Sequence, residues 1–283
     1  MSAVVVIAAY GLREALRRRV FAVVVVLTFV FLSLYALGTL YLFDNLENVI
    51  PPAGVDARTL VGATVLGLAM FGTLFLGVVL AIFLTLGVVR GDAERGLLQP
   101  LVVRPVGRGT VLVARLVGAA SVCVPYVVLV YGAAVVITRV NGDWTPDRVV
   151  TPGLELAFGV VIVAALSLLG SVFLATTANG IAVFMLFGAG LVAGLLGQIG
   201  DALNSHTLER IATVTAWVVP FEALYQDALH AITADTSGLT RFVVQLGPFG
   251  GAHVGGPLLG LWAAAYLVLA AGLAILAFTQ TDL

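Results

Sequence analysis

The sequence predicts an all-α polytopic membrane protein with six transmembrane helices. Sixty-one per cent of its 283 residues are hydrophobic and 10% are charged, and the mean hydropathy is +1.13. A soluble domain of this length has no core large enough for so much apolar surface. The apolar residues also gather into runs long enough to cross a bilayer as helices, which takes about 20 residues. We expect six spans in one transmembrane domain of residues 1–283, at 20–43, 60–89, 110–138, 154–176, 181–199 and 258–278.

Residues 1–19 precede the first span and are predicted to form an amphipathic helix on the membrane surface. Basic and apolar residues are interleaved there, and Glu14 stands four residues before Arg18, a spacing that stabilises a helix. The alternative is an arginine cluster that only sets the orientation in the membrane. Residues 20–43 are too long for the hydrophobic region of a cleaved signal peptide, so we expect a retained span.

Polar, turn-forming segments separate the spans. Residues 44–58 and 139–152 are rich in Pro, Gly, Asn and Asp, which predicts loops. Pro125 falls inside the third span, where we expect a kink. Only residues 177–180 separate the fourth span from the fifth, so these two spans are expected to form a helical hairpin.

The fifth span contains a pair of small residues at helical spacing. Gly190 and Gly194 lie four residues apart and would allow two helices to approach closely. This pair is a candidate dimer interface. The alternative is chance, because the chain contains 32 glycines.

Residues 200–257 form the longest segment outside the predicted spans, and we expect two external or re-entrant helices in it. The first is expected near residues 206–217. The second begins at Pro220, and its apolar residues recur with the period of an amphipathic helix. The predicted apolar face comprises Phe221, Leu224, Tyr225, Leu229 and Ile232. Gln226 is placed on the other face, where we expect a charge to be tolerated.

Residues 90–115 are a charged segment between two long apolar runs. Seven of its residues are charged, namely Arg90, Asp92, Glu94, Arg95, Arg104, Arg108 and Arg115. Unpaired charge is costly in hydrocarbon, so this segment is expected in water or against a partner protein.

The distribution of arginines predicts the orientation in the membrane. With six spans and the N-terminus inside, nine arginines lie on or near the cytoplasmic side and five lie outside. The nine are Arg13, Arg17, Arg18, Arg19, Arg90, Arg95, Arg104, Arg108 and Arg115, and the five are Arg58, Arg139, Arg148, Arg210 and Arg241. Both termini and the charged segment are therefore expected in the cytoplasm.

Several classes of chemistry find no support in the residues. All 14 basic residues are arginine, which excludes the lysine of a Walker-type phosphate loop, and the net charge of −1 argues against a nucleic-acid partner. His206, His230 and His253 match no metal-ligand spacing, and Cys123 lies in an apolar run. Glu155 is interpreted as a first-turn residue in the headgroup region, with an intramembrane functional carboxylate as the alternative. We expect no catalytic residue, cofactor or metal in this chain.

The charged segment resembles the cytoplasmic loop of ABC-2 type transporter permeases. The resemblance rests on Asp92-x-Glu94-x-Gly96-Leu97-Leu98, Pro105-Val106-Gly107-Arg108-Gly109 and Ala114-Arg115. The family pattern has Thr at the position of Leu97 and Lys at that of Arg115, and Pro100 interrupts its short helix. The order of surface helix, six spans and paired helices before the last span is also similar. The Gly-Arg-Gly turn is most similar to the branch that contains the nitrous oxide reductase maturation permease.

The resemblance implies a non-catalytic half-transporter in the inner (cytoplasmic) membrane. Two permeases, identical or different, would pair around a translocation path, and each would dock on a cytoplasmic ABC ATPase subunit. ATP and Mg²⁺ would be bound by these two ATPase copies and not by this chain. Residues 90–109 would act as the coupling loop of an exporter. The residues that the resemblance assigns to coupling are Asp92, Glu94, Arg95, Gly96, Arg104, Pro105 and Arg108.

The competing hypothesis is a secondary transporter or channel that needs no ATPase. Ion-coupled carriers usually place carboxylates near the midplane of the membrane, and the predicted spans contain few ionisable residues. The sequence therefore favours the ATP-driven permease, while the substrate stays open.

Overall fold

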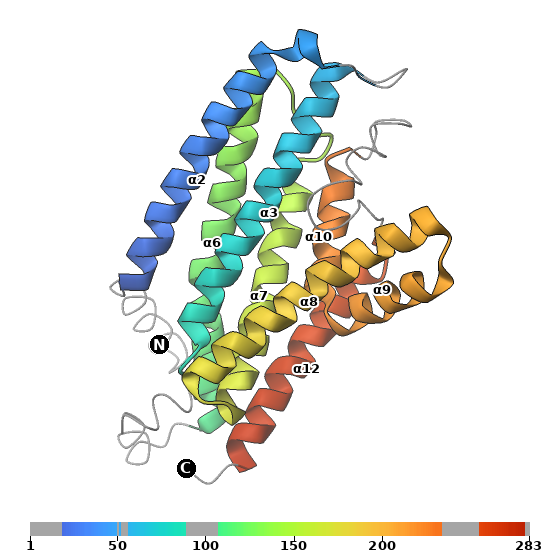
Figure 1. The fold of residues 1–283 in the computed structure, drawn as a ribbon. Helices are drawn as coiled ribbons and strands as arrows, with labels where there is room; N and C mark the ends of the chain where they lie inside the picture. Colours follow the sequence, from blue (N-terminus) through green and yellow to red (C-terminus); the bar gives the residue numbers. More distant parts are fainter. Residues whose placement is uncertain (1–18, 50, 52–55, 89–106, 234–254, 281–283) are drawn as a thin grey trace.

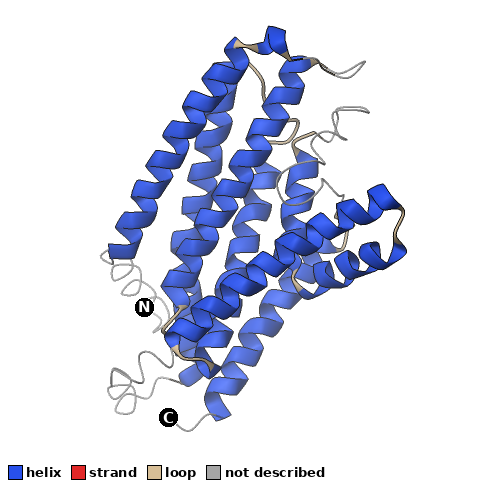
Figure 2. Cartoon of the chain, in the orientation of Figure 1, coloured by secondary structure: helices blue, strands red, loops and turns tan. Residues whose placement is uncertain are grey.

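The computed structural model describes residues 19–49, 51, 56–88, 107–233 and 255–280, and every regular element in this part of the chain is helical (Figure 2). Six helices are long and apolar enough to cross a membrane. They are α2 (Arg19–Asp44), α3 (Ala57–Thr85), α6 (Arg108–Gly142), α7 (Val150–Phe173), α8 (Thr176–Leu203) and α12 (Leu259–Gln280). A short 3₁₀ helix, η1 (Leu46–Asn48), follows α2. The predicted fold class is confirmed, while the expected surface helix at 1–19 lies almost wholly outside the described residues.

Two shorter helices lie between α8 and α12 in the chain. α9 (His206–Val218) runs back along α8, and α10 (Pro220–Ala231) then turns away from it (Figure 1). Both begin close to the residues that the sequence predicts, His206 and Pro220. Proline suits the first turn of α10, where its missing N–H has no helical partner to lose.

α3 and α7 form the centre of the bundle, and α2 and α12 lie at its edges (Figure 1). Most residues of α3 and α7 are buried by other helices, which explains why these two helices are apolar on every side. α2 exposes large apolar side chains such as Phe29 and Tyr41. Such a face is accommodated by lipid, because the helix satisfies its own backbone hydrogen bonds.

The interior is closely packed where α3, α6 and α7 meet. Met70 and Leu74 of α3 are fully buried. A Cβ added at Gly77 would lie 2.8 Å from a methyl group of Val127 on α6 and 2.9 Å from one of Val160 on α7. Glycine therefore sets the close approach of the three helices.

Hydrogen bonds between side chains join α2 to α6. The hydroxyl groups of Tyr35 and Thr138 are 2.5 Å apart, and Asn141 Nδ2 donates to Thr39 Oγ1 at 2.7 Å. Polar groups of this kind hold neighbouring spans together, since lipid offers them no alternative partner. They fix α2 although most of its surface is exposed.

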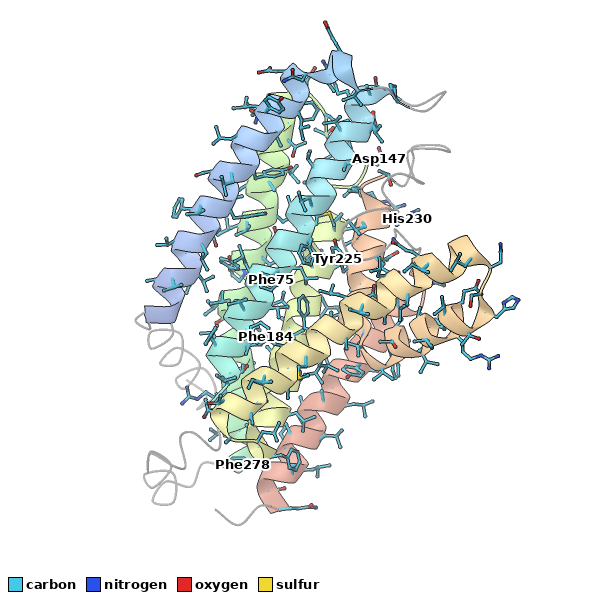
Figure 3. All side chains as sticks on the ribbon, viewed as in Figure 1. Phe75, Asp147, Phe184, Tyr225, His230 and Phe278 are labelled. Atoms are coloured by element: carbon cyan, nitrogen blue, oxygen red, sulfur yellow. The ribbon has the colours of Figure 1, made fainter. Side chains whose placement is uncertain are left out.

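The bundle has two ends. At the end that we call the loop end, α3 ends, α6 begins and α12 ends, so residues 89–106 join the bundle here. Phe278 lies at the loop end, whereas Asp147 and His230 lie towards the opposite end (Figure 3).

Several predicted helix boundaries differ from the structure, and three places show this most clearly. α3 ends at Thr85 and continues as a turn to Val88, whereas the prediction extended the span to residue 89. α6 continues through Gly142 and ends where Asp143 adopts a left-handed conformation (φ 48°). Residues 177–180 lie in the first turns of α8, because the break between α7 and α8 occurs at 174–175.

Candidate functional site

The predicted coupling loop joins α3 to α6. Asp92, Glu94, Arg95, Gly96, Arg104 and Pro105 lie outside the described residues, and Arg108 is described only as the first residue of α6. Both attachment points of the loop are described. Gly107 precedes α6 as its N-cap, and Val88 ends the turn after α3. The predicted coupling loop is therefore continuous with α3 and α6.

An apolar cluster contains Val88 and, in the first turns of α6, Leu112. Its buried members are Val88, Leu112, Leu168, Val172, Ala274 and Phe278. Val88 belongs to the turn after α3 and Leu112 to the first turns of α6, whereas the other four belong to the last turns of α7 and α12. Because packed side chains move together, the cluster joins four spanning helices at the loop end into one unit.

Asn179 of α8 adds a polar connection beside this cluster. Its side chain is fully buried, and its Nδ2 donates to the carbonyl oxygens of Leu86 at 3.2 Å and Ser167 at 2.9 Å. Leu86 is the C-cap of α3, where carbonyl groups lack helical partners. Asn179 therefore fastens the end of α3 to α7 and α8.

Asn179 is not among the residues that the sequence singles out, because residues 177–180 are predicted to be a connection between two spans. Gly170 on α7 leaves the space that the Asn179 side chain occupies, because a Cβ added there would overlap Asn179 Oδ1. An Asn-Gly pair beside a long apolar run was the only signal in the sequence. The role of this pair follows from the structure, which places Asn179 inside α8.

The apolar face predicted for the second short helix is buried. Phe221, Leu224, Tyr225, Leu229 and Ile232 are each at most 2% exposed. The rings of Phe221 and Phe187 stack with centroids 5.3 Å apart, and Leu224 packs against Ile162 and Ala263. α10 is thus held between α7, α8 and α12.

The other face of α10 is also covered, so the structure does not favour the predicted tolerance of a charge at Gln226, which stays a prediction. Gln226 is 8% exposed and Glu222 is 3% exposed, and Gln226 Nε2 donates to Glu222 Oε1. Burial raises the pKa of Glu222 to about 7, although the hydrogen bond from Gln226 acts in the opposite direction. The periodicity of α10 does not predict the burial of Glu222 and Gln226, because the residues that cover them belong to another helix, α8.

Gly190 and Gly194 provide the space on α8 for this contact. A Cβ at Gly190 would lie 2.9 Å from the ring of Phe221, and one at Gly194 would overlap the Glu222 carboxyl group. The close approach that their spacing predicts is therefore made to α10 of the same chain. A role of this pair in pairing two permeases stays a prediction.

Acidic groups gather where α10 passes α7. Asp227 Oδ1 accepts a hydrogen bond of 2.6 Å from the backbone N–H of Gly255, and its carboxyl group interacts with that of Glu155 on α7. The backbone N–H of Asp147 donates to Ile232 O at 3.2 Å, which ties the end of α10 to the loop between α6 and α7. Glu155 thus faces a second carboxyl group, which its position near Pro152 in the sequence did not reveal.

Among the described residues, no group of three His, Cys, Asp or Glu side chains is arranged to hold a metal. His206 Nδ1 lies 3.4 Å from Glu209 Oε2 on the exposed side of α9. His230 lies near the end of α10 (Figure 3), and His253 is outside the described residues.

Six helices long and apolar enough to cross a membrane, with an inserted helix pair before the last one, define an all-α multi-pass membrane protein. Residues 5–283 match the family model described as ABC-2 family transporter protein. The chain belongs to this family and is a non-catalytic permease subunit of an ATP-binding cassette transporter. No curated protein matches its sequence.

Proposed function

We propose that this chain forms the translocation path of an ATP-driven exporter and that residues 90–109 couple it to a separate ATPase. The supporting observation is the attachment of a charged, family-like segment to one packed cluster at both of its ends. Movement of the segment would pass to Val88 and Leu112. The cluster would then carry the ends of α7 and α12 along, because close packing leaves little room for independent movement.

The charged residues of the loop are proposed to orient the ATPase on the permease. Asp92, Glu94, Arg95, Arg104 and Arg108 would make polar contacts with it, and Gly96 and Pro105 would shape the turns between them. Exposed charges at an interface determine partner choice and orientation more than raw affinity. Their loss is therefore expected to impair coupling more than folding.

The complete transporter is proposed to contain two permeases and two ATPase subunits. ATP and Mg²⁺ would bind to the ATPases, and the second permease would be identical to this chain or a relative of it. The arginine distribution supports an inner-membrane protein with both termini in the cytoplasm. The turn at residues 107–109 supports a relation to the branch of the nitrous oxide reductase maturation permease.

Charge reversal in the loop tests this function. Glu94→Arg and Arg108→Glu should each lower the amount of ATPase that co-purifies with the permease, or uncouple ATP hydrolysis from transport. Like charges would then face each other across the interface. The sequence predicts that this segment lies in water, where a charge contributes little to stability, so the permease should remain monodisperse.

The matched control is Glu47→Arg, which reverses an exposed charge in η1. This variant should retain normal ATPase association and hydrolysis. If both loop variants behave like the control, residues 90–109 do not couple the permease to an ATPase. Substrate flux through the purified permease without any ATPase would instead support the secondary transporter.

A further inference from the structure

A cavity of about 650 Å³ lies between α8, α9, α10 and the start of α12. Small residues are prominent in its lining, among them Gly194 and Gly197 on α8 and Ala212 and Ala216 on α9. This volume falls in the range of sites that take small organic ligands, about 300–1,000 Å³. The cavity is open on one side, and its walls are mostly apolar.

Two carboxyl groups and no basic side chain line this cavity among the described residues. Glu222 is 3% exposed, and its polar partner in the described part of the chain is Gln226. Glu209 lies at the more exposed side and is paired with His206. A buried carboxylate without a counter-ion is costly, so a cation entering the cavity would offset the cost that Glu222 bears.

Two tryptophans form an aromatic wall beside these acidic groups. The ring centroids of Trp217 and Trp262 are 5.4 Å apart, and Trp262 Nε1 donates to the carbonyl oxygen of Trp217 at 3.2 Å. Tyr266 meets the ring of Trp262 edge-on at 6.1 Å. These contacts place the two indole rings next to each other, and tryptophan is the best aromatic partner for a cation.

We propose that this cavity binds an organic cation with an apolar body, such as a quaternary ammonium compound. The positive head lies between Glu222 and the two tryptophans, and the apolar body lies along the glycine and alanine walls. Anions are disfavoured by the carboxylates. Because the proposal concerns binding to this chain alone, it does not depend on coupling to an ATPase.

The test measures ligand binding to the full-length permease in maltoside micelles, which contain no ammonium groups. Hexyltrimethylammonium, hexanesulfonate and hexanol serve as cationic, anionic and neutral probes with the same alkyl chain. Calorimetry and tryptophan fluorescence should show saturable binding of the cation and only weak partitioning of the other two. Equal binding of all three probes, or no saturable binding of the cation, would overturn the proposal.

Glu222→Gln removes the charge and keeps the shape of the side chain. It should weaken cation binding by about tenfold or more, since the ammonium group loses a partly desolvated charge partner. Glu47→Gln makes the same change at an exposed carboxyl group on η1 and should leave the affinity unchanged. If folded Glu222→Gln binds the cation as well as the Glu47 variant does, Glu222 is a neutral structural residue and the proposal fails.

If Glu222→Gln does not fold, two variants on α9 test whether the cation binds in this cavity. No residue of α9 is buried, so changes there should not disturb the core. Trp217→Phe should weaken binding several-fold by removing the stronger cation–π partner, and Ala216→Phe should abolish it by filling the cavity. Unchanged affinity in both variants would show that the ligand does not bind in this cavity.

Discussion

Replacing Asn179 with alanine should loosen the end of α3 at the point where the coupling loop begins. The substitution removes the donor to the carbonyl oxygens of Leu86 and Ser167, at 3.2 and 2.9 Å. The bond to Ser167 is buried in the bundle, and the bond to Leu86 at the end of α3 is partly buried. The change therefore affects the connection between α3, α7 and α8 and leaves the apolar cluster of Val88 in place.

The expected loss of stability in Asn179→Ala follows from the two hydrogen bonds that Asn179 Nδ2 donates. Bonds between helices in membrane proteins contribute about 0.6 kcal/mol on average and up to about 1.7 kcal/mol. Asn179 Oδ1 has no hydrogen-bond partner among the described residues, so its removal offsets part of the loss. We expect a net destabilisation of about 1–2 kcal/mol, with the better helix propensity of alanine acting in the opposite direction.

Unfolding of the purified permease in mixed micelles by a denaturing detergent measures this difference. Asn45→Ala is the matched control, because among the described residues Asn45 Nδ2 donates to Tyr41 O, one turn away, in an exposed hydrogen bond. Asn179→Ala should unfold at a lower denaturant fraction than the control. Equal stability of the two variants would refute the role assigned to Asn179.

Two other predictions concern the α8–α10 contact and the orientation in the membrane. Gly194→Ala should cost about 1–3 kcal/mol by overpacking against Glu222, whereas Gly188→Ala, where an added Cβ meets nothing within 4 Å, should be neutral or slightly stabilising; similar unfolding of both would contradict this packing. An impermeant thiol reagent applied to intact cells should label a cysteine introduced at Asp143 but not one at Glu94, and labelling at Glu94 would reverse the proposed orientation.

The spanning helices could be predicted from sequence because the bilayer allows few alternatives. A long apolar run must form a helix there, since its backbone groups find no partners in lipid. The helix ends were less predictable. Asp143 ends α6 because it adopts a left-handed conformation, and an Asn-Gly-Asp sequence does not reveal which of its residues does so.

The surroundings of α10 show why part of the candidate site was missed. The apolar stripe followed from periodicity, and its burial agrees with that pattern. The burial of Gln226 depends on Gly194, which lies on another helix, and the contact of Glu155 with Asp227 depends on the insertion of α10 beside α7. Contacts between distant segments of this kind leave no periodic signal in one sequence.

Cross-linking from the loop tests the central claim most directly. In a Cys123→Ala background, a single cysteine replaces Glu94 in the charged segment or Glu47 in η1, and a thiol-reactive cross-linker is applied in native membranes. Mass spectrometry then identifies the captured chain. We predict that the cysteine at position 94 captures an ABC ATPase and that the one at position 47 does not. Capture of the ATPase from position 47 alone, or from neither position, would contradict the claim that this loop is where the ATPase docks.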